Sequence, residues 1–302
     1  MTVNPANSRW HPAWLCLLTL LCAVATYADH PVSMWQVDGG NNRVFLLGSV
    51  HLLRAADHPI PPVIYSAYEE AETLIMEMDM DDVDIIEAQA LITELGLIPD
   101  GGTLRELMGP GAWSEAEGLA TRANIPLAML ASSKPWLAAI TVEQLVLTRI
   151  GFDPSYGIES HMADRAAGDE KEILGLETVR QQLELLDNMS LDSQRALLLQ
   201  SLEESVDLEA IMDELVGAWR HGNVEFLEHN MLQQIREHPE LYDTIVVERN
   251  RDWAVQIAEL LGKRDDYLVI VGALHLIGDQ GVPALLTGLG YDVAQMHQAD
   301  ER

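Results

Sequence analysis

The chain has 302 residues, of which 48% are hydrophobic, enough for the core of one large domain or of two ordinary ones. It carries 48 acidic and 18 basic residues, a formal net charge of -30. A field of this sign repels nucleic acid and anionic membrane surfaces and attracts cations and basic peptides, so the composition argues against a protein that binds nucleic acid.

The first 28 residues are typical of a secretory signal peptide. Arg9 and His11 precede an apolar segment over residues 13–24 that is too short to span a bilayer comfortably, and small-x-small cleavage sites end at residues 25 and 28. We therefore expect a mature chain of residues 29–302 that is periplasmic or secreted, with no membrane contact after the signal is removed. An uncleaved anchor is the alternative interpretation.

Both cysteines, Cys16 and Cys22, lie within this predicted signal. The mature chain then contains no thiol, which excludes disulfides, a cysteine nucleophile and thiolate metal ligands. Any metal ion must be bound by His, Asp or Glu.

A β-hairpin is predicted at the start of the mature chain. Residues 33–37 and 44–51 are apolar runs separated by a turn sequence over residues 38–42. The second run ends in Gly-x-x-His, with Gly48 and His51. A glycine at the end of a buried strand allows close approach of a ligand, and the histidine would lie at the mouth of the sheet.

A predicted helix over residues 62–73 leads to a strand over residues 74–78 with a carboxylate in an apolar run. Glu77 needs a partner there, because burying an unpaired carboxylate is costly. Residues 79–84 contain four aspartates but lack the glycine and final glutamate of a calcium loop. They therefore predict a solvated strand exit and helix start.

Helical patterns dominate the chain up to residue 261. Helices are predicted within residues 85–129, 135–150, 158–167 and 178–261. The third of these is expected to end at Gly168. Residues 172–177 predict a third buried strand, which ends on Glu177.

The pattern of the first histidine strand returns over residues 268–275, with Gly272 and His275. The matched segments 44–53 and 268–277 share the glycine, the histidine and the leucine that follows it. We expect the two strands to deliver both imidazoles to one pocket.

A helix over residues 281–289 and a strand over residues 291–296 close the chain. No Ser-, Gly- or Pro-rich linker separates the long helical region from the rest. The sequence therefore predicts one domain, residues 29–302, with a helical insertion between the two Gly-x-x-His strands.

His51 and His275, with Glu77 and Glu177, are nitrogen and oxygen donors. Two imidazoles and one carboxylate leave a divalent ion with open positions for water, which is how hydrolytic metal centres are built. Such an ion lowers the pKa of its bound water toward ~7. A lone histidine at a strand end is more often structural, and it is the duplication that favours function. We prefer Glu77 to Glu177 because it interrupts an apolar strand.

Two further motifs keep two interpretations each. Arg249 and Asn250 are either part of a charged first turn or a guanidinium and an amide that bind an oxyanion or a substrate carboxylate. Residues 156–159, Tyr-Gly-Ile-Glu, are equally open. Serine chemistry is a poorer fit, because Gly-x-Ser-x-Gly is absent and Ser49 of the first motif becomes Ala273 in the second.

Taken in order, these motifs resemble the TraB/GumN family. The matching segments are residues 48–51, the Glu77 strand, and residues 156–159, 175–178 with Gln181 or Gln182, 248–250, 272–275 and 281–286. The resemblance covers residues 35–296. It extends to the Tiki metalloproteases and, more remotely, to erythromycin esterase-like and ChaN-like proteins.

The resemblance implies an α/β fold, with a central mixed sheet wrapped by helices. It implies that His51, Glu77 and His275 bind a divalent metal such as manganese, cobalt or zinc, and that Arg249 and Asn250 assist substrate or transition-state binding. Glu177 is the other carboxylate candidate. Because Tiki relatives act on peptides, metal-dependent hydrolysis of a peptide, or of a small molecule, is the leading hypothesis. The oligomeric state is left open.

Two alternatives stay open beside hydrolysis by a metal. ChaN-like relatives suggest capture of haem or iron, with both histidines as axial ligands, and TraB-like relatives suggest binding of a peptide pheromone. The erythromycin esterase relationship permits an esterase in which His51 is a general base without metal.

Overall fold

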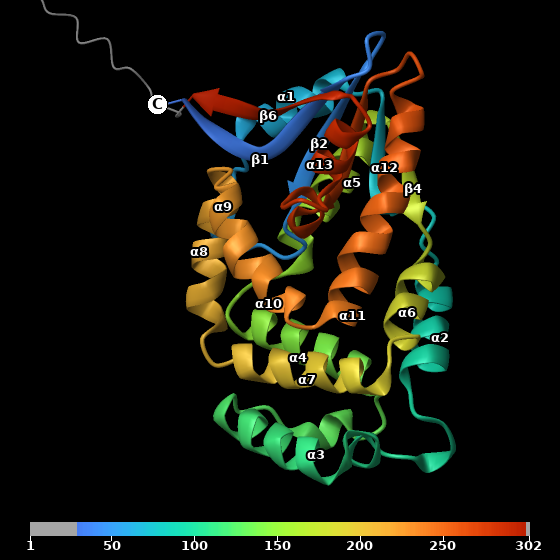
Figure 1. The fold of residues 1–302 in the computed structure, drawn as a ribbon, viewed down its shortest axis with the longest axis vertical. Coiled ribbons are helices and arrows are strands. Elements are labelled where there is room, and N and C mark those ends of the chain that lie inside the picture. Colours follow the sequence, from blue (N-terminus) through green and yellow to red (C-terminus); the bar gives the residue numbers. More distant parts are fainter. Residues whose placement is uncertain (1–28, 300–302) are drawn as a thin grey trace, which may run out of the picture.

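The computed structural model describes residues 29–299, and the predicted signal peptide lies outside them. Within this range one mixed sheet has the strand order β4-β3-β5-β2-β1-β6 (Figure 1). The strands are β1 (Asp29–Asp38), β2 (Arg43–Ser49), β3 (Thr73–Met78), β4 (Glu172–Glu177), β5 (Tyr267–Gly272) and β6 (Asp292–Ala299). β1 lies antiparallel between β2 and β6, and the other pairs are parallel. The predicted hairpin and the mixed α/β sheet are confirmed.

Helices connect the strands and cover the sheet. They are α1 (Pro62–Glu70), α2 (Ile85–Gly96), α3 (Leu104–Arg122), α4 (Pro135–Arg149), α5 (Ile158–Asp169), α6 (Val179–Asp187), α7 (Leu191–Glu204), α8 (Leu208–Arg220), α9 (Val224–Leu227), α10 (Gln233–Arg236), α11 (Pro239–Tyr242), α12 (Glu248–Leu260) and α13 (Val282–Gly288). The predicted helical insertion is present between β2 and β5, interrupted by β3 and β4. No helix in the described part of the chain is both long and apolar enough to cross a bilayer.

β2 and β5 form the buried centre of the sheet. They run side by side, with Ser49 opposite Gly272. Residues 44–47 and 268–271 are at most 1% exposed, since α1, α5 and α8 cover one face and α12 and α13 the other. Burial on both faces explains why these strands are continuous apolar runs rather than alternating ones. Because the strands are parallel, the two histidines that follow them start from the same edge.

β4 corrects one prediction and α5 another. Residues 172–177 are a strand, but they are not buried: β4 pairs only with β3 at the sheet edge, and only Ile173 is buried among its residues. A run of six residues does not reveal whether a second strand covers its far side. α5 continues past the predicted stop at Gly168, and Glu170 takes the left-handed conformation at its end (φ 57°).

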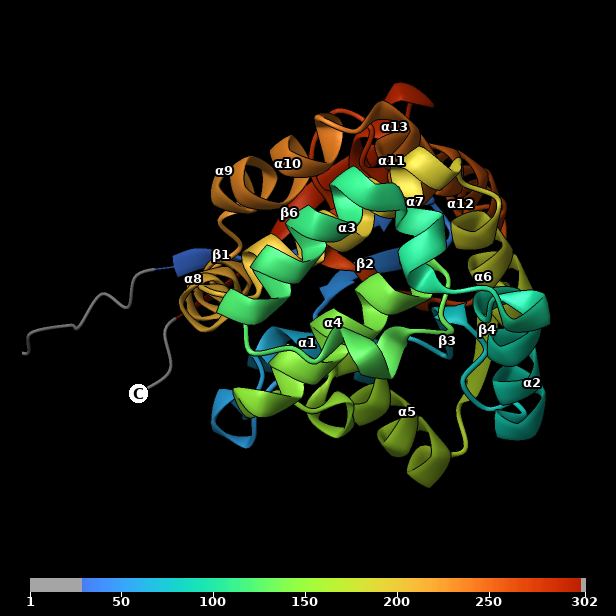
Figure 2. The same cartoon turned by 90° about the horizontal axis from the view of Figure 1, so that it is seen from below.

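A separate layer of helices, α3, α4 and α7, lies beyond the carboxyl ends of the parallel strands (Figure 1). Figure 2, seen from that side, shows these helices across the front of the molecule. They have an apolar core of their own, with Leu119, Val142 and Leu198 among its buried residues. This layer faces the sheet edge from which the histidines start.

Candidate functional site

The carboxyl ends of β2, β3 and β5 bring three predicted residues to one place. His51 lies just after β2, Glu77 is in β3, and His275 lies in a 3-10 turn after β5. Gly272 lies between them. A Cβ atom at this glycine would be 3.2 Å from Nε2 of His51, 3.3 Å from Oε1 of Glu77, and 3.6 Å from Cδ2 of the second imidazole. Both imidazoles therefore meet in one pocket, as the repeated strands predict.

Arg249 joins the two glutamates of the site. Its Nη2 donates to Oε2 of Glu77 at 2.7 Å, and its Nε is 3.1 Å from both carboxylate oxygens of Glu177. All three side chains are only 11 or 12% exposed. The Trp253 ring lies 4.5 Å from the guanidinium carbon, a cation–π contact. Glu177 thus holds Arg249, and Glu77 is the carboxylate beside the histidines.

Glu77 is ionised and surrounded by donors. Its Oε1 accepts the backbone N–H of Gly272 at 2.8 Å, and its Oε2 accepts Nε2–H of Gln182 at 3.1 Å. Burial alone would raise the pKa of Glu77. The charge on His275, which is protonated only in the acid range in which Glu77 titrates, and the charges on Arg249 and His51 lower it to about 2. Arg249 supplies the permanent positive charge among these neighbours.

The start of α6 distinguishes the two glutamines of the motif. Thr178 and Gln181 form a capping box, in which the Thr178 hydroxyl oxygen accepts the backbone N–H of Gln181 and the side-chain Oε1 of Gln181 accepts the backbone N–H of Thr178. Gln182, the next residue, is the one that reaches Glu77. The cap therefore fixes the helix that delivers this donor.

His275 is buried and neutral. Asn250 donates from Nδ2 to the carbonyl of Gln280 at 2.8 Å, so its Oδ1 faces Nδ1 of His275 at 2.7 Å as an acceptor. We therefore assign the proton of His275 to Nδ1. Its Nε2 then accepts from Nη1 of Arg249 at 3.2 Å. Burial lowers the pKa of His275 to about 3.

His51 has the opposite environment. Its side chain is 58% exposed, and its Nδ1 lies 2.7 Å from Oε1 of Glu159, in the first turn of α5. The hydroxyl of Ser49 donates to the same oxygen. The Glu159 carboxylate raises the pKa of His51 to about 9. One imidazole of the site is therefore cationic at neutral pH, and the other is neutral.

Glu159 is a site residue whose segment, residues 156–159, the sequence left open between a structural and a functional interpretation. Its position depends on Gly157, where a Cβ atom would collide with the carbonyl oxygen of His51. The next backbone N–H, of Ile158, donates to the carbonyl of Val50 at 3.1 Å. The start of α5 thus packs directly on the chain around His51. Apart from the family resemblance of residues 156–159, the signal in the sequence was an acidic residue in a first helical turn, which is common.

A cavity of about 430 Å³ opens beside these residues. His51, Glu77, Arg249 and His275 form its polar end. The rest of its wall is mainly apolar and comes from α4, α8 and two π-helical turns, η5 (Glu228–Leu232) and η6 (Asp243–Val247); it includes Leu147, Met212, Leu215, Val216, Met231 and Ile245. π-Helical turns are frequent at functional sites. The cavity has the size and the lining of a site for a small organic molecule or a few peptide residues.

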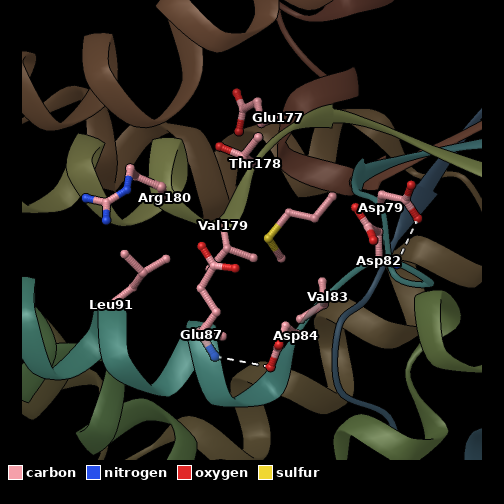
Figure 3. A pocket seen from close by; sticks show the side chains of 12 residues that line it. Asp79, Asp82, Val83, Asp84, Glu87, Leu91, Glu177, Thr178, Val179 and Arg180 are labelled. Carbon is pink, nitrogen blue, oxygen red and sulfur yellow. Dashed lines mark hydrogen bonds between the residues drawn. The ribbon is translucent and has the colours of Figure 1, made fainter.

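Glu177 also borders a smaller pocket lined by Asp79, Asp82 and Asp84 (Figure 3). Asp84 accepts the backbone N–H of Ile86 at 2.8 Å and so caps α2. Asp79 accepts backbone N–H groups of the turn that follows it. The carboxylates of Asp79 and Asp84 are thus used within their own loop, and the predicted strand exit and helix start is confirmed. Neither histidine of the site lines this pocket.

The nitrogen and oxygen donors of the predicted metal site lie near one another, but they are not arranged around one common point. Among residues 29–299, no three His, Cys, Asp or Glu side chains are arranged to hold a metal ion. Nε2 of His51 and Oε1 of Glu77 face the point beside Gly272, while Nε2 of His275 is bonded to Arg249. Both Nδ1 atoms have acceptors, an arrangement that directs Nε2 to a metal. The residues therefore fit a divalent ion in donor type and tautomer, provided that it replaces the guanidinium at His275.

Comparison with known proteins gives one family and two relatives. The model of the TraB/PrgY/gumN family matches residues 33–295. The chain is 23% identical over 260 residues to the uncharacterized protein YbaP of Escherichia coli (strain K12), an alignment that covers 82% of this chain and 89% of YbaP. YbaP of Shigella flexneri gives the same values. No solved structure gives a significant match.

Proposed function

This chain belongs to the TraB/PrgY/gumN family, and we propose that it is a peptide hydrolase that works with a divalent metal ion. The observation that carries the proposal is the meeting of His51, Glu77 and His275 beside Gly272, in the lining of one cavity. The predicted signal peptide adds the proposal that the protein acts in the periplasm or after secretion.

His51, Glu77 and His275 would hold manganese, cobalt or zinc, and the bound ion would supply a water of lowered pKa and polarise the substrate carbonyl. His51 would give up its Nε2 proton to bind the ion, while Glu159 would keep the ring oriented through Nδ1. Asn250 would likewise hold the His275 ring, with Nε2 toward the site.

Arg249 is the group that we propose for stabilising the transition state. It lies between Glu77 and Glu177, so its guanidinium stays in the site whether or not it contacts His275. Once Nη1 is released from that imidazole, it can donate to the oxygen on which negative charge develops. The buried surroundings of Arg249 strengthen such an interaction relative to water.

A metal-independent esterase is the second candidate, because the contact of His51 with Glu159 is the arrangement that orients a general base. A base with a pKa of about 9 is mostly protonated at neutral pH. Hydrolysis by this route should therefore rise up to about pH 9 and survive thorough chelation.

The test is elemental analysis of residues 29–302 beside His51→Ala and His275→Ala, followed by a peptide-library cleavage assay with and without manganese. We expect the parent to bind metal and to cleave peptides, and both variants to lose both properties. Absence of metal and of any effect of manganese would overturn the proposal. Cleavage that survives chelation would support the esterase, and an absorption band on haem addition without cleavage would support a binding protein.

A further inference from the structure

Glu143 lines the same cavity, but the proposed reaction does not use it. It lies on α4, and its side chain is exposed to the space inside the cavity. The hydroxyl of Ser201, on α7, donates to its Oε1 at 2.5 Å. Among residues 29–299, no Lys, Arg or His side chain forms an ion pair with Glu143. The cavity thus contains a positioned carboxylate without a counter-ion.

The surroundings of Glu143 favour a cation. Burial raises the pKa of Glu143, against the effect of the Ser201 hydrogen bond, and the neighbouring Glu204 raises it further. With the Ser201 hydroxyl as its hydrogen-bond donor and no ion pair to a described side chain, this carboxylate has a charge that is poorly compensated within the protein. A cationic group that enters the cavity would compensate it at short range.

The apolar wall beside Glu143 indicates the chemistry of the rest of the ligand. Leu147 lies one turn further along α4, on the same face of the helix, and Met212 and Leu215 of α8 also line the cavity. We propose that the cavity binds a substrate whose apolar chain carries an ammonium group, with Glu143 as the counter-ion. This inference rests on the proposed function in taking the cavity as the substrate site. A peptide can supply the ammonium from its N-terminus or from a lysine side chain.

The direct test is calorimetric binding of two probes of equal length, hexylammonium and 1-hexanol. We expect the parent to bind hexylammonium about 10-fold more tightly. Glu143→Gln should bring the two affinities together and leave that for 1-hexanol unchanged. Glu117→Gln removes the same charge from an exposed position on α3, so it controls for the net charge and should keep the preference. Equal affinities in the parent, or a preference that persists in Glu143→Gln, would overturn the inference.

Competition against hexylammonium identifies the source of the ammonium group. The probes are Leu-Leu-Leu amide, its N-acetyl form, and N-acetyl-Leu-Leu-Lys amide. Stronger competition by the first supports a peptide N-terminus, stronger competition by the third supports a lysine side chain, and equal competition by all three would refute an ammonium-bearing peptide substrate.

Binding needs no turnover, so the preference for hexylammonium is measured in the parent without added metal. A preference without peptide cleavage would refute the proposed hydrolysis alone. Cleavage without a preference would refute the role of Glu143 alone.

Discussion

Glu159→Gln tests the electrostatics of His51 most directly. The substitution keeps the size of the side chain and removes its charge, so the pKa of His51 should fall from about 9 toward its ordinary value of 6.5. For a fully desolvated pair, the difference between these two pKa values would correspond to about 3 kcal/mol of unfolding free energy. The His51 side chain is 58% exposed, so solvent screening reduces the expected contribution to about 1 kcal/mol.

The pH dependence of this contribution has a definite sign. Because Glu159 raises the pKa of His51 in the folded protein above its value in the unfolded chain, the stabilisation is fully present below about pH 6.5 and is lost as the pH rises through about 9. The parent should therefore unfold at higher urea concentration than Glu159→Gln at about pH 6, and the difference should vanish at about pH 10.

An NMR titration of the His51 ring, alongside urea unfolding at the two pH values, measures both effects. Asp164→Asn is the matched control, since it removes an exposed carboxylate from the same helix and should leave the pKa of His51 near its parent value. A pKa that stays near 9 in Glu159→Gln would refute the assignment of the shift to this contact.

Three further perturbations test other parts of the site. Gly272→Ala places a methyl group 3.2 Å from Nε2 of His51, so metal uptake should fall more than about 10-fold with little change in the melting temperature. Gly118→Ala is the control, because nothing lies within 4 Å of a Cβ atom there, and it should keep metal uptake. Equal metal uptake by the two variants would contradict the site. Asn250→Ala leaves a buried imidazole N–H unpaired and should lower the unfolding free energy by about 1–3 kcal/mol in urea, against little change for the exposed Gln256→Ala. Manganese affinity by calorimetry should rise about tenfold per pH unit between about pH 6.5 and 8.5, because the ion displaces a proton from His51; a pH-independent affinity would mean that His51 is not a ligand.

The site residues that could be predicted from the sequence are those that interrupt or end a buried strand. His51, Glu77 and His275 are conspicuous because the runs around them are apolar, and the repeated Gly-x-x-His pattern predicts that two of them share a pocket. Parallel pairing of β2 with β5 then brings them to one edge. This part of the site follows from local pattern and from the geometry of parallel strands.

The partners of these residues could not be found in the same way. Glu159 contacts His51 across 108 positions, and its own neighbourhood is an ordinary helix start. The wall of the cavity was also hidden, because Met212 and Met231 have the same spacing as core residues of any amphipathic helix. Which apolar side chains face a cavity depends on how the helices meet, and no single helix encodes that.

The pairing of β2 with β5 also determines when the site can form during folding. Ser49 and Gly272 lie opposite each other, so the loop that must close between them includes most of the described chain. Neither strand carries a complete donor set, and a nascent chain in which β5 has not yet been made has His51 and Glu77 without His275 or Gly272. The donor set at the polar end of the cavity is therefore complete only once β5 and the turn after it have been synthesised and have paired with β2.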